Sequence, residues 1–134
     1  MRTQSQKQTI VLFVVVFFLF LLTSTLSKAQ QALSDDDLES KPVLQSFDDA
    51  LKTPTDAYRL FLCNLPYTSP AAEIEKLINL HQLYLDPKQV KSFAPHLPKL
   101  KVLKIVYVDA GEASEAEKAE IKQLLATVKM SFDF

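Results

Sequence analysis

The chain has 134 residues, 48% of them apolar, and its 15 Lys and Arg against 16 Asp and Glu give a formal net charge of −1. This length suits one small domain, and the charge provides none of the positive excess that nucleic-acid binding needs. The single cysteine, Cys63, cannot close an internal disulfide, so we expect the domain to be held together by packing.

The N-terminal segment has the order of a secretory signal peptide. Arg2 and Lys7 precede an unbroken apolar run over residues 10–22, and small residues then lead to a cleavage point after Ala29. We therefore expect residues 1–29 to be a signal peptide and the protein to be secreted, periplasmic or in the cell envelope. The apolar run would span about 20 Å as a helix, which is short of the ~30 Å hydrocarbon core. An uncleaved N-terminal membrane anchor is the alternative.

Cleavage would remove three basic residues and leave 12 Lys and Arg against 16 Asp and Glu, a net charge of −4. That balance disfavours nucleic acid and anionic membrane surfaces as partners, and the cleaved chain is not expected to insert stably in a membrane. Residues 30–42 are polar and acidic with no apolar period, which predicts a flexible leader. Residues 43–134 then form the domain.

The first half of the domain alternates helical and extended patterns. Apolar spacing predicts a helix over 43–53, with Leu44, Phe47 and Leu51 on one stripe and Ser46 as its cap. A strand is predicted at 57–62. A helical connector is then expected to begin with Ser69 as cap and Pro70 in its first turn.

The second half repeats this alternation. A second strand is predicted at 80–85. The connector at 92–98 has two prolines and favours a 3₁₀ turn. A third strand is expected at 100–105, with an extension to Val108 as an alternative. Ser114 and Glu117 form the capping box of a C-terminal helix, and residues 128–134 alternate apolar and polar as a final strand does.

The three strands share the pattern LxxLxL. It occurs at 80–85 and 100–105, and more loosely at 57–62, with Leu60 and Leu83 23 residues apart and Leu83 and Leu103 20 apart. This recurrence resembles the leucine-rich repeat family. The segments Ala50-Leu51-Lys52-Thr53-Pro54 and 115–134 are similar to the flanks of short bacterial members. One family feature is missing: the asparagine expected after each strand is replaced by Leu65, Lys88 and Val108.

The resemblance implies an α/β fold, a short solenoid of parallel strands with helical or 3₁₀ connectors. It also implies an N-terminal helical cap and a C-terminal helix–strand cap. Residues between the repeat leucines would face outward on the concave sheet, and aromatic residues beside basic ones are typical of protein-binding surfaces. The candidate protein-binding residues are Arg59, Phe61, Gln82, Tyr84, Val102, Lys104 and Val106. In the expected register, Lys104 lies beside Tyr84 and Val106 beside Asp86.

The sequence predicts no catalytic, metal or cofactor site. His81 and His96 are not spaced to share a metal, Cys63 has no evident base, and one glycine is too few for a phosphate loop. We therefore expect a non-enzymatic module that binds an unidentified protein through the concave face. The alternative is a purely structural or self-associating diverged repeat protein that forms a homo-oligomer without an external ligand.

Overall fold

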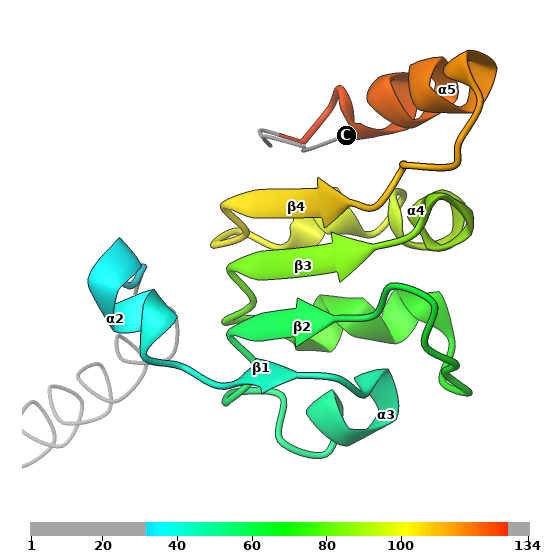
Figure 1. The fold of residues 1–134 in the computed structure, drawn as a ribbon. Helices are drawn as coiled ribbons and strands as arrows, with labels where there is room; N and C mark the ends of the chain where they lie inside the picture. The colour runs from blue at the N-terminus through cyan, green and yellow to red at the C-terminus, as the bar shows by residue number, and fades with distance from the viewer. Residues whose placement is uncertain (1–31, 129–134) are drawn as a thin grey trace, which may run out of the picture. The chain divides into compact units, whose positions relative to one another are not determined.

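The computed structural model describes residues 32–128. Their fold is mixed α/β, built on a four-stranded parallel sheet with strand order β1-β2-β3-β4 (Figure 1). The strands are β1 Val43–Leu44, β2 Arg59–Phe61, β3 Gln82–Leu85 and β4 Ile105–Val108. The helices are α2 Asp35–Glu39, α3 Phe47–Ala50, α4 Pro87–Phe93 and α5 Glu115–Leu125, with 3₁₀ helices η1 Ala71–Lys76 and η2 Leu97–Lys99.

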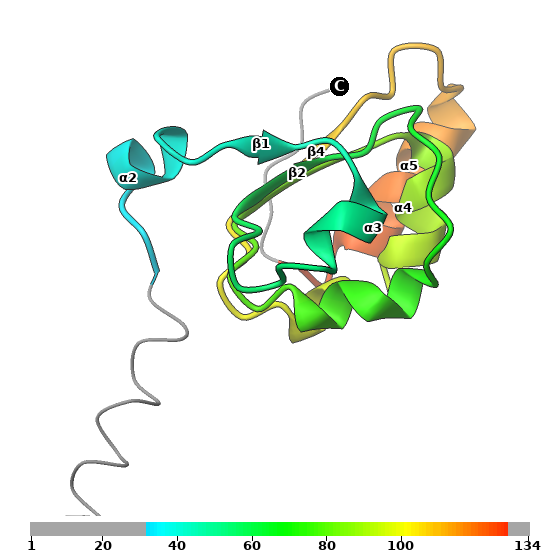
Figure 2. The same cartoon turned by 90° about the horizontal axis from the view of Figure 1, so that it is seen from below.

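Helical crossovers join β1 to β2, β2 to β3 and β3 to β4, because neighbouring parallel strands cannot be joined by a tight turn. The helices α3, η1, α4 and α5 all lie on one face of the sheet, and none of them covers the other face (Figure 2). In the space between sheet and helices, Leu60, Leu83 and Phe93 are fully buried. Within residues 32–128, no helix has the length and apolar content needed to cross a membrane.

The three strands β2, β3 and β4 follow one another at a constant interval. Leu60 pairs with Leu83, and Leu83 pairs with Val106, so both of these steps are 23 residues. The step from β1 to β2 is shorter, since Leu44 pairs with Leu60. The predicted spacing of 20 residues to the third strand is therefore wrong by three. Leu103 takes the place expected for Leu100, and Gly111, not Val108, occupies the position of the missing asparagine.

The predicted helix over 43–53 is replaced by a strand, a turn and a shorter helix. Val43 and Leu44 pair with the edge of β2. The helix α3 begins only after Ser46, whose hydroxyl accepts a hydrogen bond from the Asp49 amide as expected for a cap. The apolar spacing of Leu44, Phe47 and Leu51 is compatible with both structures, because all three side chains pack in or against the core although only Phe47 lies in a helix.

The first connector differs from the prediction, and the second contains an α-helix as well as the 3₁₀ turn that was predicted. The first is the 3₁₀ helix η1, and the Ser69 hydroxyl does not cap it because it donates to the Asp48 carboxylate instead. The second begins with α4, where Asp86 and Gln89 form a capping box around Pro87. The 3₁₀ turn expected at 92–98 follows only as η2.

The C-terminal capping box is confirmed, since Ser114 and Glu117 bond reciprocally at the start of α5. Residues 32–42, expected to be a flexible leader, contain α2, and Leu38 is 1% exposed. The predicted signal peptide at 1–29 lies outside the described residues, as does the final strand beyond Val128.

Candidate functional site

The sheet face opposite α3, η1, α4 and α5 presents a row of three aromatic side chains. Phe61 pairs with Tyr84, and Tyr84 pairs with Tyr107. The rings of Phe61 and Tyr84 have centroids 5.6 Å apart, and those of Tyr84 and Tyr107 stack at 4.5 Å with an interplanar angle of 14°. All three are half-buried. We call Phe61, Tyr84 and Tyr107 the aromatic row.

A second row lies two residues earlier on each strand. Arg59 donates from Nε to Gln82 Oε1 at 2.8 Å, and Gln82 pairs with the half-buried Ile105 of β4. Val43 extends this row onto β1 and is 39% exposed, and it is the only exposed large apolar side chain among residues 32–128. The face is therefore aromatic along its centre and mixed apolar and polar where the strands begin.

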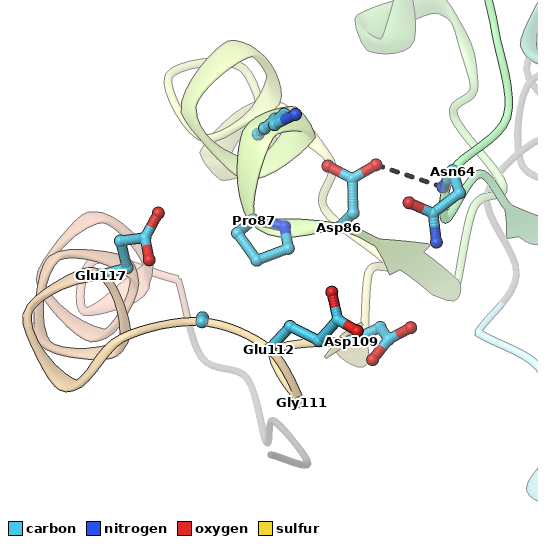
Figure 3. Close-up of a pocket in the computed structure, with 9 residues that line it drawn as sticks. Asn64, Asp86, Pro87, Asp109, Gly111, Glu112 and Glu117 are labelled. Carbon is cyan, nitrogen blue, oxygen red and sulfur yellow. Dashed lines mark hydrogen bonds between the residues drawn. The ribbon is translucent and has the colours of Figure 1, made fainter.

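A groove of about 490 Å³ opens where β3 and β4 end. Four carboxylates line it together with Asn64 and Lys88 (Figure 3). They are Asp86, Asp109, Glu112 and Glu117. Because the acids outnumber the basic side chains of its lining, the groove favours positively charged groups.

Backbone bonds fix the shape of this groove. Asp86 accepts the Gln89 amide at 2.9 Å and the Asn64 amide at 3.1 Å, so it joins the start of α4 to the loop after β2. Asn64 has a positive φ of 58°, a conformation that asparagine tolerates better than most residues. Among residues 32–128, no group of three or more His, Cys, Asp or Glu side chains has an arrangement that could hold a metal ion.

Cys63 is a half-buried free cysteine two residues after Phe61 of the aromatic row, and it directly precedes the groove residue Asn64. Burial raises the pKa of its thiol, and the negative charge of Asp109 raises that pKa further. Both effects reduce the thiolate fraction, and the thiolate is the nucleophilic form of cysteine. This environment is the reverse of the electropositive one that activates catalytic cysteines.

The structure brings together only part of the predicted binding set. Phe61, Tyr84, Arg59 and Gln82 lie on the outward face as expected. The outward orientation predicted for Val106 is wrong, because Val106 is in register with Leu83 and fully buried.

The two remaining candidates lie before β4. Val102 is half-buried in a turn, outside the sheet. Lys104 is exposed and pairs not with the aromatic row but with the segment before β1, donating to the Leu33 carbonyl at 2.6 Å and to Asp35 at 3.0 Å. Lys104 does not lie beside Tyr84, since Tyr107 occupies that place.

Sequence reasoning missed Tyr107 and Ile105 because the third strand was placed three residues early. Residues 103–108, Leu-Lys-Ile-Val-Tyr-Val, fit the same pattern as 100–105 with valine in place of two leucines. The 23-residue interval between the first two strands was the available signal, since repeating it gives Val106.

The two histidines lie in different environments. His81 is fully buried, with its ring nitrogens bonded to backbone atoms of Asn79 and Leu33. His96 is partly exposed and lies 2.7 Å from the Glu75 carboxylate. Lys99, 2.8 Å from the same carboxylate, and then His96 lower the pKa of Glu75.

No family model matches the chain, and neither a curated protein nor a solved structure matches it.

Proposed function

We propose that this chain is a non-enzymatic protein-binding module whose partner lies on the outward face of the sheet. The observation that supports this best is the aromatic row, three rings held in register on the sheet face opposite α3, η1, α4 and α5. Aromatic side chains bury a large area and lose little conformational freedom when they are already stacked, which is why they dominate binding hot spots.

The negative charge of the groove beside the aromatic row indicates the charge of the partner. Asp86 and Asp109 follow the aromatic row at the end of β3 and β4, and Glu112 lies beyond them in the groove. A partner segment with apolar or aromatic side chains over the row and a Lys or Arg over the groove would complement both surfaces. The partner we propose is therefore a protein segment with this apolar and basic pattern.

We also propose that the repeats form a short solenoid of the leucine-rich repeat type. This proposal is supported by the constant 23-residue register of Leu60, Leu83 and Val106 and by the helical crossovers that join successive strands. Export through a cleaved signal peptide at residues 1–29 is a proposal from the sequence alone, and it places the partner in the secreted or cell-envelope compartment.

The test compares the full-length chain with a Phe61→Ala/Tyr84→Ala variant. A partner is captured from the exported fraction, identified, and its Kd for both chains measured by calorimetry. Truncating two hot-spot aromatics should weaken binding by at least about tenfold. A Lys101→Ala/Gln123→Ala variant, altered at exposed positions away from the sheet face, should bind as the wild type does.

Two results would overturn the proposal. One is a captured partner whose Kd is the same for the wild type and the aromatic variant, while circular dichroism shows both to be folded. The other is a dimer, detected by sedimentation in the absence of any partner, that the aromatic variant abolishes. That second result would assign the face to self-association.

A further inference from the structure

We call the segment 32–41 the strap. It is attached to the sheet by Arg59, the first residue of β2, and by His81 and Lys104, which directly precede β3 and β4. Arg59 Nη1 donates to the Glu39 carbonyl at 3.3 Å and to the Lys41 carbonyl at 3.4 Å. Next along the sheet, His81 accepts the Leu33 amide, and Lys104 donates to the Leu33 carbonyl. The strap thus crosses from β2 to β4 at the end where the strands begin.

The contacts of His81 determine its protonation state. Its Nδ1 lies 2.6 Å from the Asn79 carbonyl oxygen, and its Nε2 lies 3.2 Å from the Leu33 amide nitrogen. A carbonyl can only accept and a backbone amide can only donate, so the proton is on Nδ1 and Nε2 has the free lone pair. The strap is therefore bound by the neutral imidazole, in the tautomer that has its proton on Nδ1.

A second proton on His81 would abolish this contact. The N–H on Nε2 would face the N–H of Leu33, and a cation would be enclosed in a site where the ring is 0% exposed. An imidazole takes up a proton near pH 6.5 when it is in water. The protonated ring would therefore be accommodated best after Leu33 has left it.

The surrounding charged and titratable groups do not offset this cost. The ring centroid of Tyr58 lies 6.1 Å from that of His81. The Lys41 ammonium lies over the Tyr58 ring, 5.0 Å from its centroid, and is a further positive charge. The Lys104 ammonium holds the same Leu33 peptide and adds positive charge. Asp35 contributes a negative charge near these residues, but its side chain is 88% exposed and already paired with Lys104.

We propose that His81 is a pH-sensitive clasp that holds the strap at neutral pH and releases it when the ring is protonated. Release would free the Nη1 donor of Arg59 and the ammonium of Lys104, while Arg59 Nε would stay bonded to Gln82. The clasp goes beyond the proposed binding function and does not depend on it, because it stands on the strap's own contacts.

Hydrogen exchange of the full-length chain between pH 7.5 and 5 tests the clasp, followed by NMR at single amides. After correction for intrinsic chemistry, the protection factor of the Leu33 amide should fall as the pH is lowered from 7.5 to 5, with a limiting slope of about tenfold per pH unit for the uptake of one proton. The Leu62 amide, bonded to the Tyr84 carbonyl at 2.9 Å inside the sheet, should keep its protection. Equal loss at both amides would indicate general unfolding and overturn the clasp.

Two variants separate His81 from the other histidine. In His81→Gln the side-chain amide keeps an acceptor but does not titrate, so protection of the Leu33 amide should not depend on pH. In His96→Gln the pH response should match that of the wild type, because His96 lies on the surface beside Glu75. A response that disappears in His96→Gln, or persists in His81→Gln, refutes the proposal.

A measurement on the wild type decides the question if His81→Gln does not fold. Nitrogen NMR of the His81 ring at pH 7.5 should show the proton on Nδ1 and not on Nε2. A proton on Nε2, or a Leu33 amide whose protection is the same at pH 7.5 and pH 5, would overturn the clasp.

Discussion

Replacing Gln89 by methionine should destabilise the fold at the junction of two repeats. Gln89 is 6% exposed, and its side chain makes three bonds. Nε2 donates to the Leu62 carbonyl at 2.7 Å and to the Leu65 carbonyl at 3.3 Å, while Oε1 accepts the Asp86 amide at 3.0 Å. Gln89 thus bonds the backbone of the preceding loop, which is the role that the missing asparagine would have in the family that the sequence resembles.

The magnitude follows from these contacts. Methionine keeps the volume of the side chain, so the loss comes from the polar interactions. Each buried hydrogen bond contributes about 1 kcal/mol, the long contact to Leu65 contributes less, and the Leu62 carbonyl retains the Leu65 amide as a donor. The free energy of unfolding should therefore fall by about 2–3 kcal/mol.

Urea unfolding followed by circular dichroism measures this change. The matched control is Gln123→Met on the exposed side of α5, which should stay within about 0.5 kcal/mol of the wild type. If Gln89→Met also stays within 0.5 kcal/mol, the bonds of Gln89 do not stabilise the junction and the reasoning is refuted.

Three further predictions concern the core, the acid range and the thiol. Leu83→Ala should lower the free energy of unfolding by about 2–5 kcal/mol in urea titration, because Leu83 is fully buried in the inner strand β3; a loss below about 1 kcal/mol would contradict this placement. The Ser69 hydroxyl is the main cause that lowers the pKa of Asp48 to about 2, so the carboxylate stabilises the fold above the ordinary carboxyl pKa. That stability is lost as the pH falls toward about 2, and acid unfolding followed by circular dichroism should depend less on pH in Asp48→Asn. Cys63 should react with a disulfide reagent at pH 7.5 more slowly than free cysteine, since burial and Asp109 raise its pKa; a faster reaction would show an activated thiol.

The sequence by itself determined the parts of this fold that depend on local patterns. Periodicity placed strands around Leu60 and Leu83, and their 23-residue spacing matched the observed register. The caps at Ser46 and Ser114 followed from side-chain oxygens that bond amides only three residues away. It also placed Phe61 and Tyr84 side by side on the outward face, because alternation in a strand sets the direction of each side chain.

Tertiary structure decided the features that depend on long-range pairing. Residues 100–105 and 103–108 both fit the strand pattern, and only pairing with β3 selects the second, which buries Val106 and turns Tyr107 outward. The segment 32–41 has the composition of a leader, yet it is held by partners 48 and 71 residues away, His81 and Lys104. Local composition cannot show such contacts, since the energy that orders a polar segment comes from groups that only the fold brings to it.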